Sequence, residues 1–203
     1  MITIRQKTCE KLTRLLDKTV RELDAIKMDD REDQVHMGAT TIKTDGFAIA
    51  DNRDRAMKVV ANANASAKMI VDEAVKAVEK LLTDAPDEDA GRYIASIADR
   101  SDLKENEIRA ALERYSGHAA QHAILAAASR SGVDKFGRKT DVEQALDSLA
   151  KLNNDVDRLY GLGMVNVGVS DSTAVLAKAV YRTFAETGET DALTVMRGLT
   201  SEG

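Results

Sequence analysis

Residues 56–82 read AMKVVANANASAKMIVDEAVKAVEKLL. Apolar or small residues recur in this stretch with the alternating three- and four-residue spacing of a heptad repeat. The spacing predicts one stripe on a helix of about 27 residues, roughly 40 Å long. Because each alanine buries little apolar area, such a stripe needs at least one partner helix. The predicted helix-interface positions are Met57, Val60, Asn64, Ala67, Val71, Ala74, Val78 and Leu81.

The positions that flank this stripe are also apolar or small, for example Ala63 and Ile70. The resulting face is wider than a dimeric zipper requires, which favours a helical bundle. Asn64 has two interpretations. It could pair with a symmetry mate and set the register, or it could lie at the stripe edge and bond to a neighbouring helix. The second is favoured because Asn52 and Asn62 show that this region uses asparagine elsewhere.

Composition predicts an all-α fold. The chain has 203 residues, one proline (Pro86), no tryptophan and only 3% aromatic residues. Few forced helix breaks and 31% charged residues are typical of helical proteins. The core must therefore be built mainly from Ala, Val, Leu, Ile and Met.

Charge and cysteine content restrict the function. A net charge of −5 argues against a protein that coats nucleic acid with most of its surface. The single cysteine, Cys9, excludes an internal disulfide and a multi-cysteine zinc site. No stretch reaches the length of a membrane-spanning helix and the first ten residues are polar. We therefore expect a cytoplasmic protein with no membrane contact.

Local signals divide the N-terminal half into three parts. Periodicity predicts a first helix at about 5–28, and the charge run at 29–33 predicts a solvated loop. Alternating β-branched residues around Asp45-Gly46 predict a small β-hairpin at about 40–50. The long Ala-rich helix follows at about 52–83.

Asp84-Ala85-Pro86 is the clearest boundary signal. It predicts two parts, a long-helix half at 1–85 with the β excursion and a compact multi-helix half at 86–203. The second half contains a capping box at Thr140 to Glu143 and a helix terminator at Gly188. Its predicted helices cover about 87–99, 102–115, 118–129, 140–159, 170–187 and 191–199.

Candidate catalytic and metal-binding motifs are sparse. His118 and His122 share a helix face, but two ligands do not make a metal site. The glycines of residues 161–168 lack the strand and spacing of a dinucleotide-binding loop. We therefore predict no catalytic, metal-binding or cofactor-binding residues and no enzymatic activity.

One segment has a family resemblance. Residues 108–117 read IRAALERYSG, and residues 129–132 read SRSG. Residues 108–139 resemble the Fis-type helix-turn-helix at the C-terminus of bacterial enhancer-binding regulators. The resemblance implies a recognition helix that opens with Ser129-Arg130. It also implies that the following basic residues face DNA phosphates or bases: Arg130, Lys135, Arg138 and Lys139. The alternative is a helix pair and a basic loop inside a bundle.

Three functional hypotheses follow. The first is a non-enzymatic helical interaction or assembly protein that contacts a protein partner, with a homo-oligomer expected. A structural or host-directed factor of a phage or mobile element would suit this chain by class analogy. The second is a helix-turn-helix DNA-binding regulator that uses residues 118–139. A metal-assisted enzyme at His118 and His122 is third.

Overall fold

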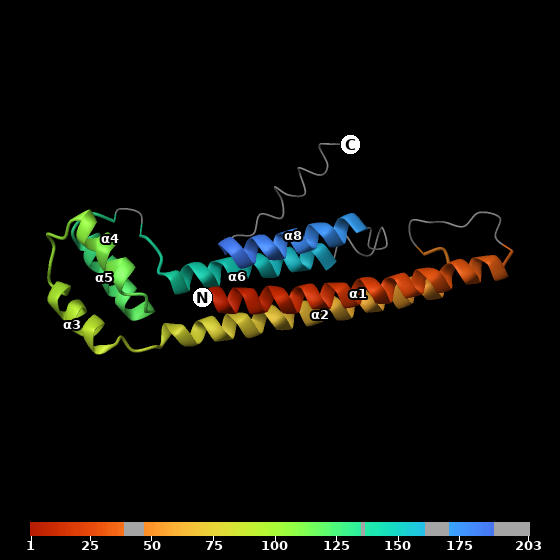
Figure 1. Cartoon of the computed structure of the whole chain (residues 1–203), viewed down its shortest axis with the longest axis horizontal. Coiled ribbons are helices and arrows are strands. Elements are labelled where there is room, and N and C mark those ends of the chain that lie inside the picture. The colour runs from red at the N-terminus through yellow and green to blue at the C-terminus, as the bar shows by residue number, and fades with distance from the viewer. Residues whose placement is uncertain (39–46, 135–136, 161–170, 189–203) are drawn as a thin grey trace, which may run out of the picture. The chain divides into compact units, whose positions relative to one another are not determined.

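The computed structural model describes residues 1–38, 47–134, 137–160 and 171–188. Its regular elements are helices, which confirms the predicted all-α class (Figure 1). Within these ranges, no helix is long and apolar enough to cross a membrane. The helices are α1 (Ile2–His36), α2 (Ala50–Glu79), the 3-10 turn η1 (Lys80–Leu82), α3 (Glu88–Ile97), α4 (Glu105–Arg114), α5 (His118–Arg130), α6 (Asp141–Arg158) and α8 (Asp171–Thr187).

The β-hairpin predicted at about 40–50 is not seen. Residues 39–46 lie outside the described ranges. Residues 47–49 are described and form no strand, and Ala50 already begins α2. The backbone N–H groups of Ala48 and Ile49 bond to a side chain of α1, so this segment serves as the entry to a helix.

The chain separates into two compact units. The bundle unit contains residues 2–74 and 148–203, and the small-helix unit contains residues 75–147 with Met1. This division differs from the predicted one at Pro86. A proline marks where a helix must stop, but the apolar faces of helices far apart in sequence decide which of them pack together.

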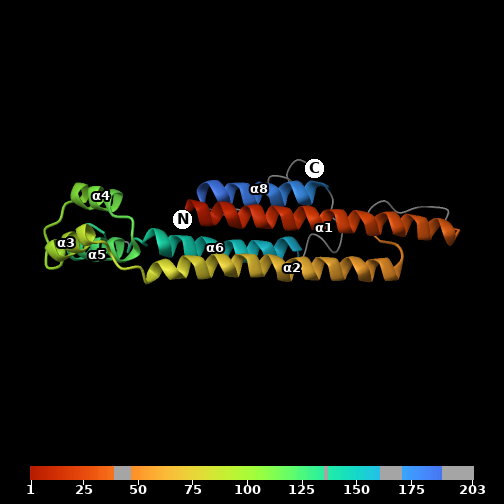
Figure 2. The ribbon, with the colours of Figure 1, turned by 60° about the horizontal axis from the view of Figure 1, so that its bottom comes forward.

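In the bundle unit, α1, α2, the second half of α6 and α8 lie side by side (Figures 1 and 2). Taken in the order α1, α2, α6 and α8, each helix of this unit runs opposite to the one before it, as in an up-down-up-down four-helix bundle (Figure 1). Helix α1 packs along α8. Three ion pairs with N···O distances of 2.7 Å connect neighbouring helices: Lys11 with Glu73, Lys68 with Asp157, and Lys178 with Asp17.

Helix α1 is longer than predicted. The sequence predicts a solvated loop at residues 29–33, but α1 continues through them to His36. Asp30 explains the difference, because its side chain faces α2 and is only 1% exposed. Asp29 and Asp33 also contact α2, through Arg55 and Asn52, so this charge run is not a solvated loop.

The Asp30 carboxylate caps the start of α2 from the neighbouring helix. It accepts hydrogen bonds from the backbone N–H groups of Ala48 (3.1 Å) and Ile49 (2.8 Å). The side-chain amides of Gln34 (2.7 Å) and Asn52 (3.4 Å) donate to it as well. Burial alone would raise the pKa of Asp30, but these four donors outweigh it and hold the pKa below the ordinary value of 3.8. The contact thus supplies an anion where the α2 backbone has unpaired N–H groups.

The small-helix unit has its own core between α3, α4 and α5. Ile97, Ile108 and Ile124 are each at most 3% exposed, and the rings of Tyr93 and Tyr115 stack with their centroids 5.0 Å apart. These contacts give the unit an apolar centre independent of the bundle.

Most helix ends of the second half follow local signals. The Asp87 carboxylate caps α3 by accepting from Ala90 N–H at 2.7 Å. The predicted Thr140 to Glu143 capping box is confirmed by reciprocal hydrogen bonds of 2.7 and 3.3 Å. The helix start predicted at Asp102 is wrong, because α4 begins at Glu105 and Asp102 pairs with a neighbouring arginine.

Small residues allow α2 to approach its neighbours closely, which leads to a first prediction. Ala67 is fully buried on α2. Ala67→Leu is therefore expected to lower the free energy of unfolding by about 2 kcal/mol, because the extra carbons force the helices apart. Urea denaturation followed by circular dichroism measures the change.

The matched control is Ala65→Leu, two residues along the same helix but exposed. In dilute solution it should stay within about 0.5 kcal/mol of the wild type. Equal destabilisation by both substitutions would contradict the assignment of the buried face.

Candidate functional site

Helix α2 carries most of the residues that the sequence predicts to form an interface. Five of the eight are buried on it: Val60, Ala67, Val71, Ala74 and Val78. Asn64 and Leu81 are half-buried, and Met57 is 38% exposed. Most of the predicted stripe therefore packs against the chain's other helices. Met57 and Leu81, at its two ends, are more exposed.

The buried face of α2 has an eleven-residue repeat rather than a heptad. Its buried positions are separated by four, four and three residues in turn. This pattern corresponds to about 3.67 residues per turn, close to a straight α-helix, whereas heptads need about 3.5. The two patterns coincide from Ala67 to Val78, and nearer the N-terminus they differ by one residue at positions 63/64 and 56/57. The buried positions are Asn52, Ala56, Val60, Ala63, Ala67, Val71, Ala74 and Val78.

Asn64 lies at the edge of this buried face and bonds to a neighbouring helix. Its side-chain nitrogen donates to Asp157 Oδ1 on α6 at 3.1 Å. The same carboxylate pairs with Lys68 at 2.7 Å. The Lys68 ammonium, with the Asn64 amide, lowers the pKa of Asp157 below its usual 3.8. This supports the second interpretation of Asn64, an edge residue.

The opposite face of α2 is exposed and forms a second stripe, which we call the outer stripe. Its centre is uncharged, and Met69 there is 66% exposed. The exposed Ala61 and Ala65 lie beside it, so the centre of this stripe is apolar. The outer stripe consists of Asp54, Lys58, Ala61, Ala65, Met69, Asp72 and Lys76, all of them exposed.

The charges of α2 differ in whether they form ion pairs with neighbouring helices. Arg55, Lys68 and Glu73 each pair with a carboxylate or an ammonium of α1 or α6. In contrast, the two aspartates and two lysines of the outer stripe make no ion pair within the described part of the chain. The paired charges therefore connect α2 to its neighbouring helices, whereas those of the outer stripe do not.

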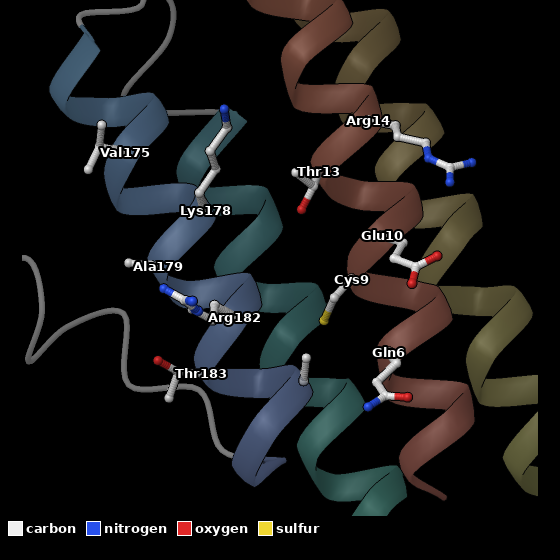
Figure 3. Close-up of a pocket in the computed structure, with 11 residues that line it drawn as sticks. Gln6, Cys9, Glu10, Thr13, Arg14, Val175, Lys178, Ala179, Arg182 and Thr183 are labelled. Carbon is white, nitrogen blue, oxygen red and sulfur yellow. The ribbon is translucent and has the colours of Figure 1, made fainter.

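An open groove of about 980 Å³ lies between α1 and α8. Figure 3 shows the Cys9 sulfur directed from α1 into the gap that faces α8. The side chain is only 6% exposed, and burial raises the pKa of its thiol to about 12, against a smaller opposite effect of Arg5. Cys9 is therefore a protonated core residue at neutral pH, not an activated nucleophile.

Two tyrosines, Tyr160 and Tyr181, are also buried inside the bundle unit. Burial raises the pKa of Tyr160 to about 12 and that of Tyr181 well above 10. The hydroxyls are near one another, and Thr19 is near that of Tyr160. Within the described residues, however, neither hydroxyl has a partner in good hydrogen-bond geometry. Both hydroxyls therefore stay protonated and neutral at physiological pH.

The basic residues of the helix-turn-helix resemblance contact the protein itself. Arg130 donates to Ala98 O at 2.7 Å, near the end of α3. Arg138 lies 3.9 Å from the buried Asp134 carboxylate, and Lys139 pairs with Asp147. The fourth, Lys135, lies outside the described residues.

The helix that the resemblance implies to open at Ser129 is not observed. Ser129 and Arg130 form the last turn of α5, and Gly132, with a φ of 68°, follows the end of that helix. The next described helix begins at Asp141. DNA binding through residues 118–139 stays a prediction, and the loss of duplex binding in Arg130→Ala with Arg138→Ala would test it.

His118 and His122 lie together on α5, with ring centroids 5.8 Å apart. His118 Nδ1 is 3.0 Å from Thr140 Oγ1, so one ring nitrogen contacts the N-terminal cap of α6. In the described ranges, no group of three or more histidine, cysteine or acidic side chains is placed to hold a metal ion. The pair alone is short of the ligands that a metal site requires.

Sequence reasoning missed the outer stripe. Because α2 has alanine on both faces, hydropathy does not separate the buried face from the exposed one. The signal that could have found it is the repeated order of charges, Asp then Lys at one end of the stripe and Asp then Lys at the other.

Comparison of the chain with protein families, with curated proteins and with solved structures found no match. Its function must therefore be argued from its own surface.

Proposed function

We propose that this chain is a non-enzymatic assembly protein that acts through a helix–helix surface and associates with itself. The observation that carries the proposal is the outer stripe of α2. Its centre is apolar and exposed, and its charges have no partner in the described part of the chain. The helix is suited to this role because its opposite face is held by the bundle unit.

The physical argument rests on Met69 and its neighbours. Its side chain is 66% exposed, so a second helix that covered it would remove apolar area from water at about 25 cal/mol per Å². The adjacent Ala61 and Ala65 would let that helix approach closely, at about 8 Å between axes. Because α2 is already ordered, its backbone loses little entropy on association.

Light scattering over a range of concentrations tests the proposal. We expect the molar mass to rise above the 22.0 kDa of a single chain between about 10 µM and about 1 mM, the range expected of a small interface. Met69→Gln should weaken this association several-fold because it places an amide at the apolar centre of the stripe.

Met28 on α1 offers a matched control, since its side chain is 65% exposed. Met28→Gln should leave the association unchanged. A monomer at every concentration would contradict self-assembly. An equal effect of the two substitutions would contradict the role of α2.

A further inference from the structure

We propose that the partner of the outer stripe is the same stripe of a second copy, with the two α2 helices antiparallel and crossing at Ala65. This inference rests on the proposed function and specifies its geometry. Its basis is the order of residues along the stripe, which is symmetric in spacing and antisymmetric in charge about Ala65.

The spacing makes the stripe self-complementary. The seven positions are separated by four, three, four, four, three and four residues, so the stripe has the same spacing in both directions. In an antiparallel pair centred at Ala65, residues equally far from it on either side oppose each other. This is the isologous arrangement of a two-fold dimer.

The charges are complementary in that arrangement. Lys58 of one copy opposes Asp72 of the other, and Asp54 opposes Lys76. Two-fold symmetry repeats each pair, so four attractive pairs surround the centre. None of these charges has an ion pair within the described part of its own chain.

The centre is complementary in size. Met69 of one copy opposes Ala61 of the other, a large side chain against a small one, and Ala65 opposes itself. Alanine at the crossing point permits the short distance between axes that this contact needs.

Other partners fit the stripe less well. A parallel pair in register would place each charge against its own kind, which is repulsive. The two aspartates and two lysines cancel, so a polyanion such as nucleic acid gains nothing from this face. The one adverse antiparallel pair is Asp51 with Glu79, about 21 Å from the crossing point and farther from it than any of the four attractive pairs.

Analytical ultracentrifugation of charge variants of the full chain tests the pairing. Lys58→Asp and Asp72→Lys, each alone, turn two attractive pairs into two repulsive ones and should weaken association about tenfold. The double variant Lys58→Asp with Asp72→Lys exchanges the two charges and should restore wild-type association. High salt should weaken the wild type because the pairs are exposed.

A cross-linking experiment tests the crossing point. Ala65→Cys should form an intermolecular disulfide under mild oxidation, because the two thiols meet at the two-fold axis. Ala150→Cys, at an exposed alanine of α6, is the control and should not cross-link above background. Cys9 is buried and identical in both variants.

The outcomes separate the inference from the proposed function. If neither single charge variant weakens association, or if the double variant does not restore it, the antiparallel pairing is overturned and self-assembly remains in place. A monomer at all concentrations would overturn both. Cross-linking of Ala150→Cys as fast as Ala65→Cys would also overturn the inference.

Discussion

Asp30→Ala is expected to lower the free energy of unfolding by about 3 kcal/mol, although the substitution lies in a charge run of the sequence. The carboxylate is 1% exposed and accepts from two backbone N–H groups and two side-chain amides. Its removal takes the acceptor away from the part-buried N–H groups of Ala48 and Ile49, and a hydrogen bond to a charged group contributes about 1.5–3 kcal/mol. Urea denaturation followed by circular dichroism measures the loss.

Asp30→Asn removes the negative charge of the side chain but keeps its size and shape. The amide keeps one oxygen acceptor but loses the negative charge at the start of α2, so about half of the effect should remain. Asp24→Ala, at an exposed position of the same helix, is the matched control and should stay within about 0.5 kcal/mol of the wild type. Similar stabilities of Asp30→Ala and Asp24→Ala would contradict the capping role.

The pH dependence of the Asp30 contribution follows from its pKa. The folded pKa lies below the ordinary 3.8, so the unfolded chain binds the proton more tightly. The charged contribution is therefore complete well above pH 3.8 and is lost as the pH falls through the folded pKa. The stability difference between the wild type and Asp30→Asn should shrink between about pH 6 and about pH 3. A constant difference over this range would contradict the assignment.

Phe184→Ala is expected to have the larger effect, about 3–5 kcal/mol. Phe184 is fully buried on α8, the helix that packs along α1. Its removal leaves a cavity in a core that is poor in aromatic residues, and the helical backbone limits how far the neighbours can close it. Hydrogen exchange should show the protection of α8 amides falling first.

Two control substitutions test whether the loss of stability comes from the cavity. Phe184→Leu keeps most of the volume and should cost about 1–2 kcal/mol. Val175→Ala, at a position of the same helix that is 66% exposed, should stay within about 0.5 kcal/mol. If Phe184→Ala is no worse than Val175→Ala, α8 does not pack on the bundle as described.

The candidate surface could be predicted only in part from the sequence. The long Ala-rich helix was predicted, and Val60, Ala67 and Val71 were placed on its interface. The outer stripe was not, because a helix with alanine on both faces has no strong hydrophobic direction. Unpaired charges such as Lys58 and Asp72 become visible only when the partners of the other charges are known.

The helix-turn-helix resemblance shows the same limit. The sequence Ser129-Arg130 is equally compatible with the first turn of a helix and with the last. The structure places it at the end of α5, where the Arg130 guanidinium bonds to a carbonyl near the end of α3. Local residue types cannot distinguish these positions, because the deciding contact comes from residue 98.

The sequence by itself determined the helical class and many of the helix ends. These depend on composition and on caps such as Thr140 with Glu143, whose partners are three residues apart. The tertiary structure decided which helices pack together, which face of α2 is buried, and that α1 continues through Asp30. These outcomes depend on contacts between distant residues, such as the Asp30 carboxylate and the N–H group of Ala48, 18 residues away. Alanine and aspartate can be stable on either side of a helix, so only the packed neighbours determine which side is buried and which is exposed.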